Sequence, residues 1–160
     1  MTNKPKAIGT AGETAVVRYL RLNGFEGAER LALHGTQDEG DATLCPGVMV
    51  EVKSGHAAET ASDNQIIDWA VETEIERVNR GADIGLLVLK RKGKGAANAG
   101  QWWCILPGWA FHYLARCQYL SFDSPAMSYG LKLPPVRLTL AEVAAMLRRA
   151  GYGTPIEGQN

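Results

Sequence analysis

The sequence lacks the features of a membrane-spanning or exported chain. No uninterrupted apolar run approaches the length that crosses a bilayer. The opening segment, Met1 to Lys6, also lacks the apolar stretch of a secretory signal. We therefore expect a soluble, intracellular protein of the cytoplasm.

Cysteine is scarce, and neither sign of charge is in excess. Cys45, Cys104 and Cys117 are odd in number, lie far apart and form no Cys-x-x-Cys pair, so they indicate neither a disulfide framework nor a zinc knuckle. Reduced, mostly buried thiols are expected. Lys and Arg total 17, as do Asp and Glu, so overall charge neither favours nor excludes a polyanionic partner. Only the local placement of charge bears on function.

Apolar sequence is sufficient for one hydrophobic core. Hydrophobic residues make up 46% of the 160 residues, which suits one domain and is too little for two independent ones. We expect a single domain over 1–160, with its core at about 8–106. A C-terminal extension at about 107–152 and a frayed tail at 153–160 would follow.

Periodicity and turn residues predict helices and strands in alternation. The helices are expected from Thr10 to about Asn23, from Ser62 or Asp63 to Arg80, at 109–117 and after Thr139, and the strands at 29–33, 41–45, 48–53, 85–89 and 102–106. Four apolar residues of the second helix should face the sheet: Ile67, Val71, Ile75 and Val78. This order favours an α/β sandwich with a mixed sheet.

Glu51 and Lys53 stand two residues apart on a predicted strand, so their side chains share one face. A carboxylate followed by a lysine at a strand end suits phosphodiester hydrolysis. The carboxylate can hold a divalent cation, and the ammonium can assist a water or offset charge on the phosphate. Taken alone, such a pair is more often a solvated salt bridge, so the chemistry depends on a further acid.

Asp41 begins the preceding strand and is that further acid. It would share a Mg²⁺ ion with Glu51, because Mg²⁺ accepts few carboxylates and completes its shell with water and phosphate. The register of the hairpin decides whether Asp41 and Glu51 can share this ion. A strict two-residue loop at Pro46-Gly47 would place Asp41 opposite Val52, on the face away from Glu51. We predict instead an extra residue, through an odd-length loop or a bulge, which pairs Asp41 with Glu51.

Glu13 is a candidate third acid on the first predicted helix. Its helical neighbours are apolar, namely Val16, Val17 and Leu20. A carboxylate at the margin of an apolar face is costly unless it is paired or near a cation. Glu13 is therefore expected to complete the metal site; an ion pair with Arg18 or a solvent-facing position is the alternative.

Three segments together resemble the PD-(D/E)XK nuclease superfamily and, among its branches, the small archaeal-type and phage-encoded Holliday junction resolvases. They are Gly9-Thr10-Ala11-Gly12-Glu13, Gly40-Asp41 and Glu51-Val52-Lys53. The likeness spans roughly residues 8–90. Residues past about 107 carry no motif of the family, and Gly40 replaces the family's proline before the aspartate.

The resemblance implies a restriction-endonuclease-like αβββαβ core with a mixed central sheet flanked by helices, to which the C-terminal helix adds. It implies Asp41 and Glu51 as metal ligands, joined by Glu13 and the backbone carbonyl of Val52, with Lys53 as the catalytic lysine. The implied cofactor is Mg²⁺ or Mn²⁺. For the resolvase branch it implies a homodimer that makes paired cuts in four-way DNA, located in the bacterial host cytoplasm if phage-encoded. Two alternatives are a restriction-type or repair nuclease, and an inactive DNA-binding module of the same fold.

Basic side chains near the proposed site are candidate phosphate contacts. Arg30 flanks the site, and Gln65 is a candidate supporting group in the first turn of the second long helix. The densest basic cluster lies on the segment 90–100, which we expect to be a mobile loop: Lys90, Arg91, Lys92 and Lys94. An ordinary solvated loop is the alternative.

Three tryptophans follow this loop and invite a base-stacking role. Trp102, Trp103 and Trp109 lie next to apolar residues in the sequence. Aromatic residues in such positions usually bury, so we expect packing in the core or at a dimer interface instead.

Overall fold

The computed structural model describes residues 4–31, 40–116 and 133–154. Within these ranges the elements in chain order are α1 (Lys4–Leu22), β1 (Glu29–Arg30), β2 (Ala42–Cys45), β3 (Val48–Lys53), α2 (His56–Glu59), α3 (Asp63–Arg80), β4 (Ile84–Leu89), η1 (Ala96–Gln101), β5 (Trp103–Leu106), α4 (Gly108–Arg116), β6 (Val136–Thr139) and α5 (Leu140–Arg149). Among the described residues, no helix is both long and apolar enough to cross a membrane.

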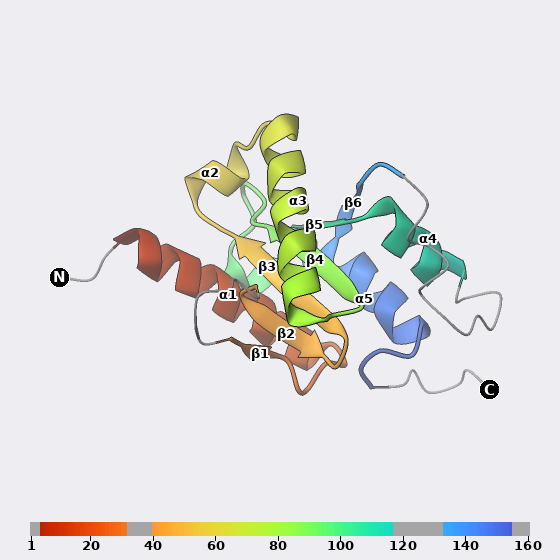
Figure 1. Ribbon diagram of the computed structural model, residues 1–160. Coiled ribbons are helices and arrows are strands. Elements are labelled where there is room, and N and C mark those ends of the chain that lie inside the picture. The colour runs from red at the N-terminus through yellow and green to blue at the C-terminus, as the bar shows by residue number, and fades with distance from the viewer. Residues whose placement is uncertain (1–3, 32–39, 117–132, 155–160) are drawn as a thin grey trace.

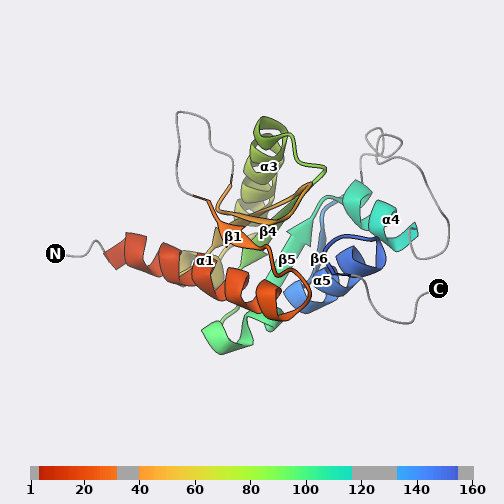
Figure 2. The same cartoon turned by 90° about the horizontal axis from the view of Figure 1, so that it is seen from below.

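The strands form one six-stranded sheet in sequence order, β1 to β6. β3 and β4 pair in parallel and every other neighbouring pair is antiparallel. The parallel pair needs a crossover, which α3 supplies. α3 covers one face of the sheet, while α1 and α5 cover the other (Figures 1 and 2). The expected α/β class, with a mixed sheet flanked by helices, is confirmed.

The larger part of the core lies between the sheet and α1 and α5. Val50 and Val88 point into it from the two central strands. A smaller cluster lies on the α3 side, where Leu87 and Ile105 meet Trp69. β4 is buried along its whole length, as expected for an apolar central strand covered on both faces.

α3 meets the sheet through a different face from the one predicted. The four residues expected to be buried are 48% to 63% exposed: Ile67, Val71, Ile75 and Val78. Ile66, Trp69 and Ala70 pack against the sheet instead, and Thr73 and Arg77 lie buried further along the helix. Arg77 can be buried because its guanidinium is satisfied: Nε donates to Glu74 at 3.2 Å and Nη1 to the carbonyl of Ala82 at 2.8 Å.

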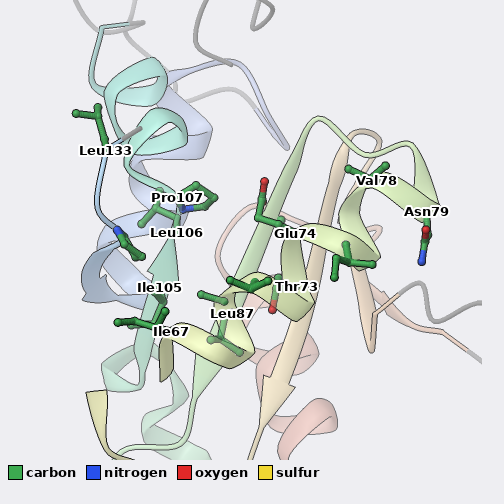
Figure 3. A pocket seen from close by; sticks show the side chains of 15 residues that line it. Ile67, Thr73, Glu74, Val78, Asn79, Leu87, Ile105, Leu106, Pro107 and Leu133 are labelled. Carbon is green, nitrogen blue, oxygen red and sulfur yellow. The ribbon is translucent and has the colours of Figure 1, made fainter. Parts of the chain in front are cut away.

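The exposed side of α3 borders an apolar groove of about 590 Å³. Figure 3 shows Ile67 of α3 near Ile105 at one end of it, while Val78 lies toward the other end, away from Leu106 and Pro107. The residues that line this groove include none of the proposed acids and not the proposed lysine. The groove is therefore separate from the candidate active site.

The helix ends confirm some predictions and correct others. α1 begins at Lys4, well before the predicted cap at Thr10. Pro5 favours this earlier start, because the N–H groups of a first helical turn have no partner within the helix and a proline there loses no hydrogen bond. The helix ends before Gly24, whose φ of 94° is left-handed. Thr139 caps α5 through the predicted capping box with Glu142.

Two short elements were not predicted, and one segment differs from the expectation. α2 and β6 are each four residues long, too short to carry a clear period. The segment 90–100, expected to be a loop, enters the 3₁₀ helix η1 at Ala96. β1 covers only Glu29–Arg30 of the predicted strand 29–33, and part of that strand lies outside the described residues.

Candidate active site

The β2–β3 hairpin contains the extra residue that a shared metal site requires. Pro46-Gly47 forms a two-residue turn, and the register then slips by one residue at Leu44. This bulge brings Asp41, just before β2, level with Glu51. The prediction about the register is confirmed, because a regular two-residue hairpin would have turned Asp41 to the opposite face.

Three hydrogen bonds fix the position of Asp41. Its N–H donates to the carbonyl of Val50 at 3.1 Å, and its carbonyl accepts from the N–H of Leu31 at 2.9 Å. Its Oδ2 accepts from the N–H of Val52 at 2.8 Å. Because the N–H and C=O of one strand residue point to the same side, the carbonyl of Val52 is also directed toward Asp41.

Glu51 and Lys53 form an ion pair against α3. Glu51 is only 7% exposed, and Nζ of Lys53 donates to its Oε1 at 2.8 Å. The same ammonium lies 3.9 Å from Oε2 of Glu72 and 5.9 Å from the ring centroid of Trp69. Burial lowers the pKa of Lys53, but the hydrogen bond and charge of Glu51 outweigh it and raise that pKa. Lys53 is therefore protonated, and its ion pair with Glu51 is partly buried, unlike a solvated surface salt bridge.

The two carboxyl groups of Asp41 and Glu51 are in contact. Burial and the charge of Glu51 raise the pKa of Asp41 to about 7, against the hydrogen bond from Val52. Burial likewise raises the pKa of Glu51 to about 7, against the effect of Lys53. A hydrogen bond between the two carboxyl groups raises the pKa of Asp41 and lowers that of Glu51, so the two groups share a proton and titrate as a coupled pair.

Glu13 reaches this pair from α1, on the other side of the sheet edge. The backbone of α1 approaches β3 closely at Gly12, where an added Cβ would lie 2.5 Å from Cβ of Ser54. Glu13 accepts a hydrogen bond from Nε of Arg30 at 2.7 Å, rather than pairing with Arg18. Its charge also raises the pKa of Asp41, after burial and Glu51. The inward lean predicted for Glu13 is thus observed, with a different basic partner.

The backbone at Gly40 explains why this position is not a proline. Its φ is 86°, a left-handed conformation closed to proline, whose ring fixes φ near −65°. A Cβ there would also collide with Cε of Met49. Glycine is therefore required by this path of the chain into Asp41.

Glu76 is a buried acid beside the site that the sequence did not single out. It is 6% exposed, and its charge raises the pKa of Glu51, after burial and against the effect of Lys53. Glu76 shares one side of α3 with Trp69 and Glu72, at helical spacings of three and four. That spacing is visible in the sequence, but periodicity alone favours the apolar stripe next to it as the buried one.

The donor set fits a small divalent cation only in part. Within the described ranges, no three His, Cys, Asp or Glu side chains stand as a ready-made metal site. Two buried, hydrogen-bonded carboxyl groups with raised pKa values do converge, and a cation would replace the proton they share. One or two carboxylates suffice for Mg²⁺, which keeps several waters and takes substrate phosphate.

The basic residues at 90–94 that were predicted to contact DNA each have different neighbours. Lys90 pairs with Glu59 at 2.8 Å, and Lys94 offers its backbone carbonyl to the indole of Trp102. Lys92 is exposed, and the Arg91 guanidinium lies over the ring of Trp103. The cluster is therefore not one free basic loop.

Gln65 and two of the tryptophans have clear positions. Gln65 is exposed in the first turn of α3, where its N–H donates to the capping Oγ of Ser62. It lies one turn before Trp69 on the side of α3 that faces Lys53. Trp102 and Trp109 are buried, so core packing is confirmed for both.

Comparisons with protein-family models, curated proteins and solved structures find no match to this chain.

Proposed function

We propose that this chain is a metal-dependent endonuclease that hydrolyses phosphodiester bonds of DNA. One observation carries the proposal. The bulge at Leu44 brings Asp41 into hydrogen-bond contact with Glu51, with the ammonium of Lys53 2.8 Å from Glu51. A salt bridge that only stabilises the fold does not need a second buried carboxylate that repels the first. A site that holds a metal cation does.

The residues have distinct proposed roles. Asp41 and Glu51, with the carbonyl of Val52 and with Glu13 nearby, would hold Mg²⁺ or Mn²⁺, which supplies Lewis acidity toward the phosphate and toward a water. Lys53 shares Glu51 with that cation and offsets negative charge that develops on the phosphate. Glu13 orients Arg30 through their hydrogen bond, so Arg30 can contact a neighbouring phosphate.

The order of the elements supports membership of the PD-(D/E)XK superfamily. From α1 to β4, apart from the one-turn helix α2, it reads helix, three strands, helix, strand. The proposed acids come from the first helix, from the residue just before the second strand and from the third strand, which Lys53 ends. The αβββαβ nuclease core predicted from the sequence is therefore retained as part of the proposal.

The proposed substrate is a four-way DNA junction, resolved by paired cuts from a homodimer. Two symmetric cuts require two active sites related by a two-fold axis, which one chain of this size does not provide. A restriction-type or repair nuclease is the nearest competitor. A molar mass by light scattering of twice that of the chain, with cuts in opposing strands within one binding event, is the expected result. A monomer that makes uncorrelated nicks would contradict the resolvase part.

A substrate panel tests the nuclease itself. Four-way junction, flap, single-stranded and linear duplex DNA are incubated with Mg²⁺, with Mn²⁺ and with EDTA. We expect metal-dependent cleavage, greatest on the junction, that Glu51→Gln abolishes and that Glu26→Gln, a control at an exposed position after α1, leaves intact. Cleavage of the linear duplex alone would refute the junction resolvase, and binding without cleavage in either metal would identify a DNA-binding module.

A further inference from the structure

Two arginines from different strand ends lie against one tryptophan. The guanidinium carbon of Arg91, just after β4, is 4.1 Å from the ring centroid of Trp103, the first residue of β5. That of Arg137, in β6, is 5.9 Å from the same centroid. Both distances lie within the range of a cation–π contact. The indole therefore brings together two positively charged side chains that lie far apart in the sequence.

The register of the sheet places this group beside the proposed catalytic lysine. Lys53 pairs with Leu89, and Leu89 pairs with Trp103. Residues paired in this way stand on the same face, so Lys53 and Trp103 share the α3 face, two strands apart. Strand spacing sets the separation of their Cα atoms at about 10 Å, which corresponds to about three steps of rise along the axis of a DNA duplex.

Charge around the two arginines is mainly positive. Lys92 is exposed next to Arg91. Asp63 lies 3.5 Å from Arg137, but its side chain is 94% exposed, so this pair is weak and a phosphate can displace it. At 4.1 Å from the ring centroid, Arg91 is close enough to stack through the face of its guanidinium, and a stacked guanidinium can still donate hydrogen bonds to a phosphate through its N–H edge.

We propose that Arg91, Trp103 and Arg137 form a phosphate clamp for the DNA strand that enters the active site. The inference rests on the proposed function, because the polyanion is its substrate. Trp103 acts as a positioning residue, since the arginines occupy its ring and leave it unsuited to base stacking. Contacts of this kind fix the position of the strand without reading its sequence.

Binding measured without cleavage tests the clamp. Fluorescence anisotropy of labelled junction and linear duplex DNA in EDTA, over a series of KCl concentrations, gives the dependence of affinity on salt. Arg91→Gln and Arg137→Gln should each reduce the steepness of log K against log [salt] by about 0.9, the value for one phosphate contact. Trp103→Leu should weaken binding without any change of charge, and Trp103→Phe should retain most of the affinity. Arg18→Gln, an exposed arginine of α1 on the other side of the sheet, is the matched control.

Each outcome separates the clamp from the nuclease proposal. Slopes for Arg91→Gln and Arg137→Gln equal to that of Arg18→Gln would overturn the clamp, as would losses confined to one base sequence. If the Trp103→Phe variant binds DNA as weakly as the Trp103→Leu variant, the aromatic ring has no role in the clamp. Wild-type cleavage in Mg²⁺ is scored separately, so a protein that binds through the clamp but never cuts would refute only the nuclease.

Discussion

At the Asp41–Glu51 pair, burial and mutual charge act in the same direction. Each effect favours a proton on the pair, and together they bring both pKa values to about 7. In the unfolded chain both groups would ionise near their ordinary values. The native protein without metal therefore binds more protons than the unfolded chain between about pH 4 and about pH 7.

This difference predicts how pH changes stability and metal binding. Because the native pKa values are raised, stability without metal should fall as pH rises from about 4 to about 7, and then level off. Metal binding displaces the shared proton, so Mg²⁺ or Mn²⁺ should bind more tightly at about pH 8 than at about pH 6. Thermal unfolding with and without metal at both pH values measures this, with Asp41→Asn as control. A metal-induced shift in Tm that is the same at both pH values would contradict the shared proton.

Gly12 permits a second test at single-residue resolution. Gly12→Ala would press a methyl group against Cβ of Ser54, and overpacking of this kind costs about 1–3 kcal/mol. It would also displace Glu13 and lower cleavage. Gly9→Ala is the matched control, since its Cβ would lie 3.7 Å from Oε1 of Glu13, an ordinary contact. In a helix interior it should stabilise by about 1 kcal/mol.

Chemical denaturation of both glycine variants distinguishes packing from helix propensity. Gly12→Ala should be the less stable of the two and the slower nuclease. Equal stabilisation by both substitutions would show that α1 does not approach β3 as closely as described.

The elements differ in how far the sequence determined them. The β3 strand, the Pro46-Gly47 turn and the Ser62 cap followed from local chemistry and were predicted correctly. The bulge at Leu44 was predicted only as a condition of the site, because no turn residue marks its position. The face of α3 was wrong, since periodicity identifies an apolar stripe but not whether a neighbouring polar stripe finds partners. Arg77 found them in Glu74 and Ala82, so the polar stripe is the one that lies on the sheet.

The orientation of α3 yields a stability prediction. Val71 is 56% exposed, whereas Leu87 beneath the helix is 1% exposed. Val71→Ser should change the free energy of unfolding by no more than about 0.5 kcal/mol, and Leu87→Ala should cost about 2–5 kcal/mol. Urea denaturation of both variants provides the comparison. A loss for Val71→Ser as large as that for Leu87→Ala would restore the orientation predicted from the sequence.

At the scale of the whole molecule, the candidate site joins segments that are distant in the chain. α1 brings Glu13, the hairpin brings Asp41 and Glu51, and α3 adds Glu76 from the face of the sheet opposite α1, the face on which Glu51 lies. The sequence predicted three of these acids because each stands in a recognisable local pattern. Glu76 belongs to no such pattern, and its position depends on how α3 packs, which is a tertiary effect.

The central claim is that Asp41 and Glu51 hold one cation for catalysis, and a double-mutant cycle of cleavage rates tests it most directly. Single-turnover cleavage of a four-way junction in Mg²⁺ is measured for the wild type, Asp41→Asn, Glu51→Gln and the double variant. Each single substitution should lower the rate by at least about 10²-fold. The double variant should be little slower than either, because the cation is already lost. Losses that multiply, or a single variant with wild-type activity, would contradict a shared cation.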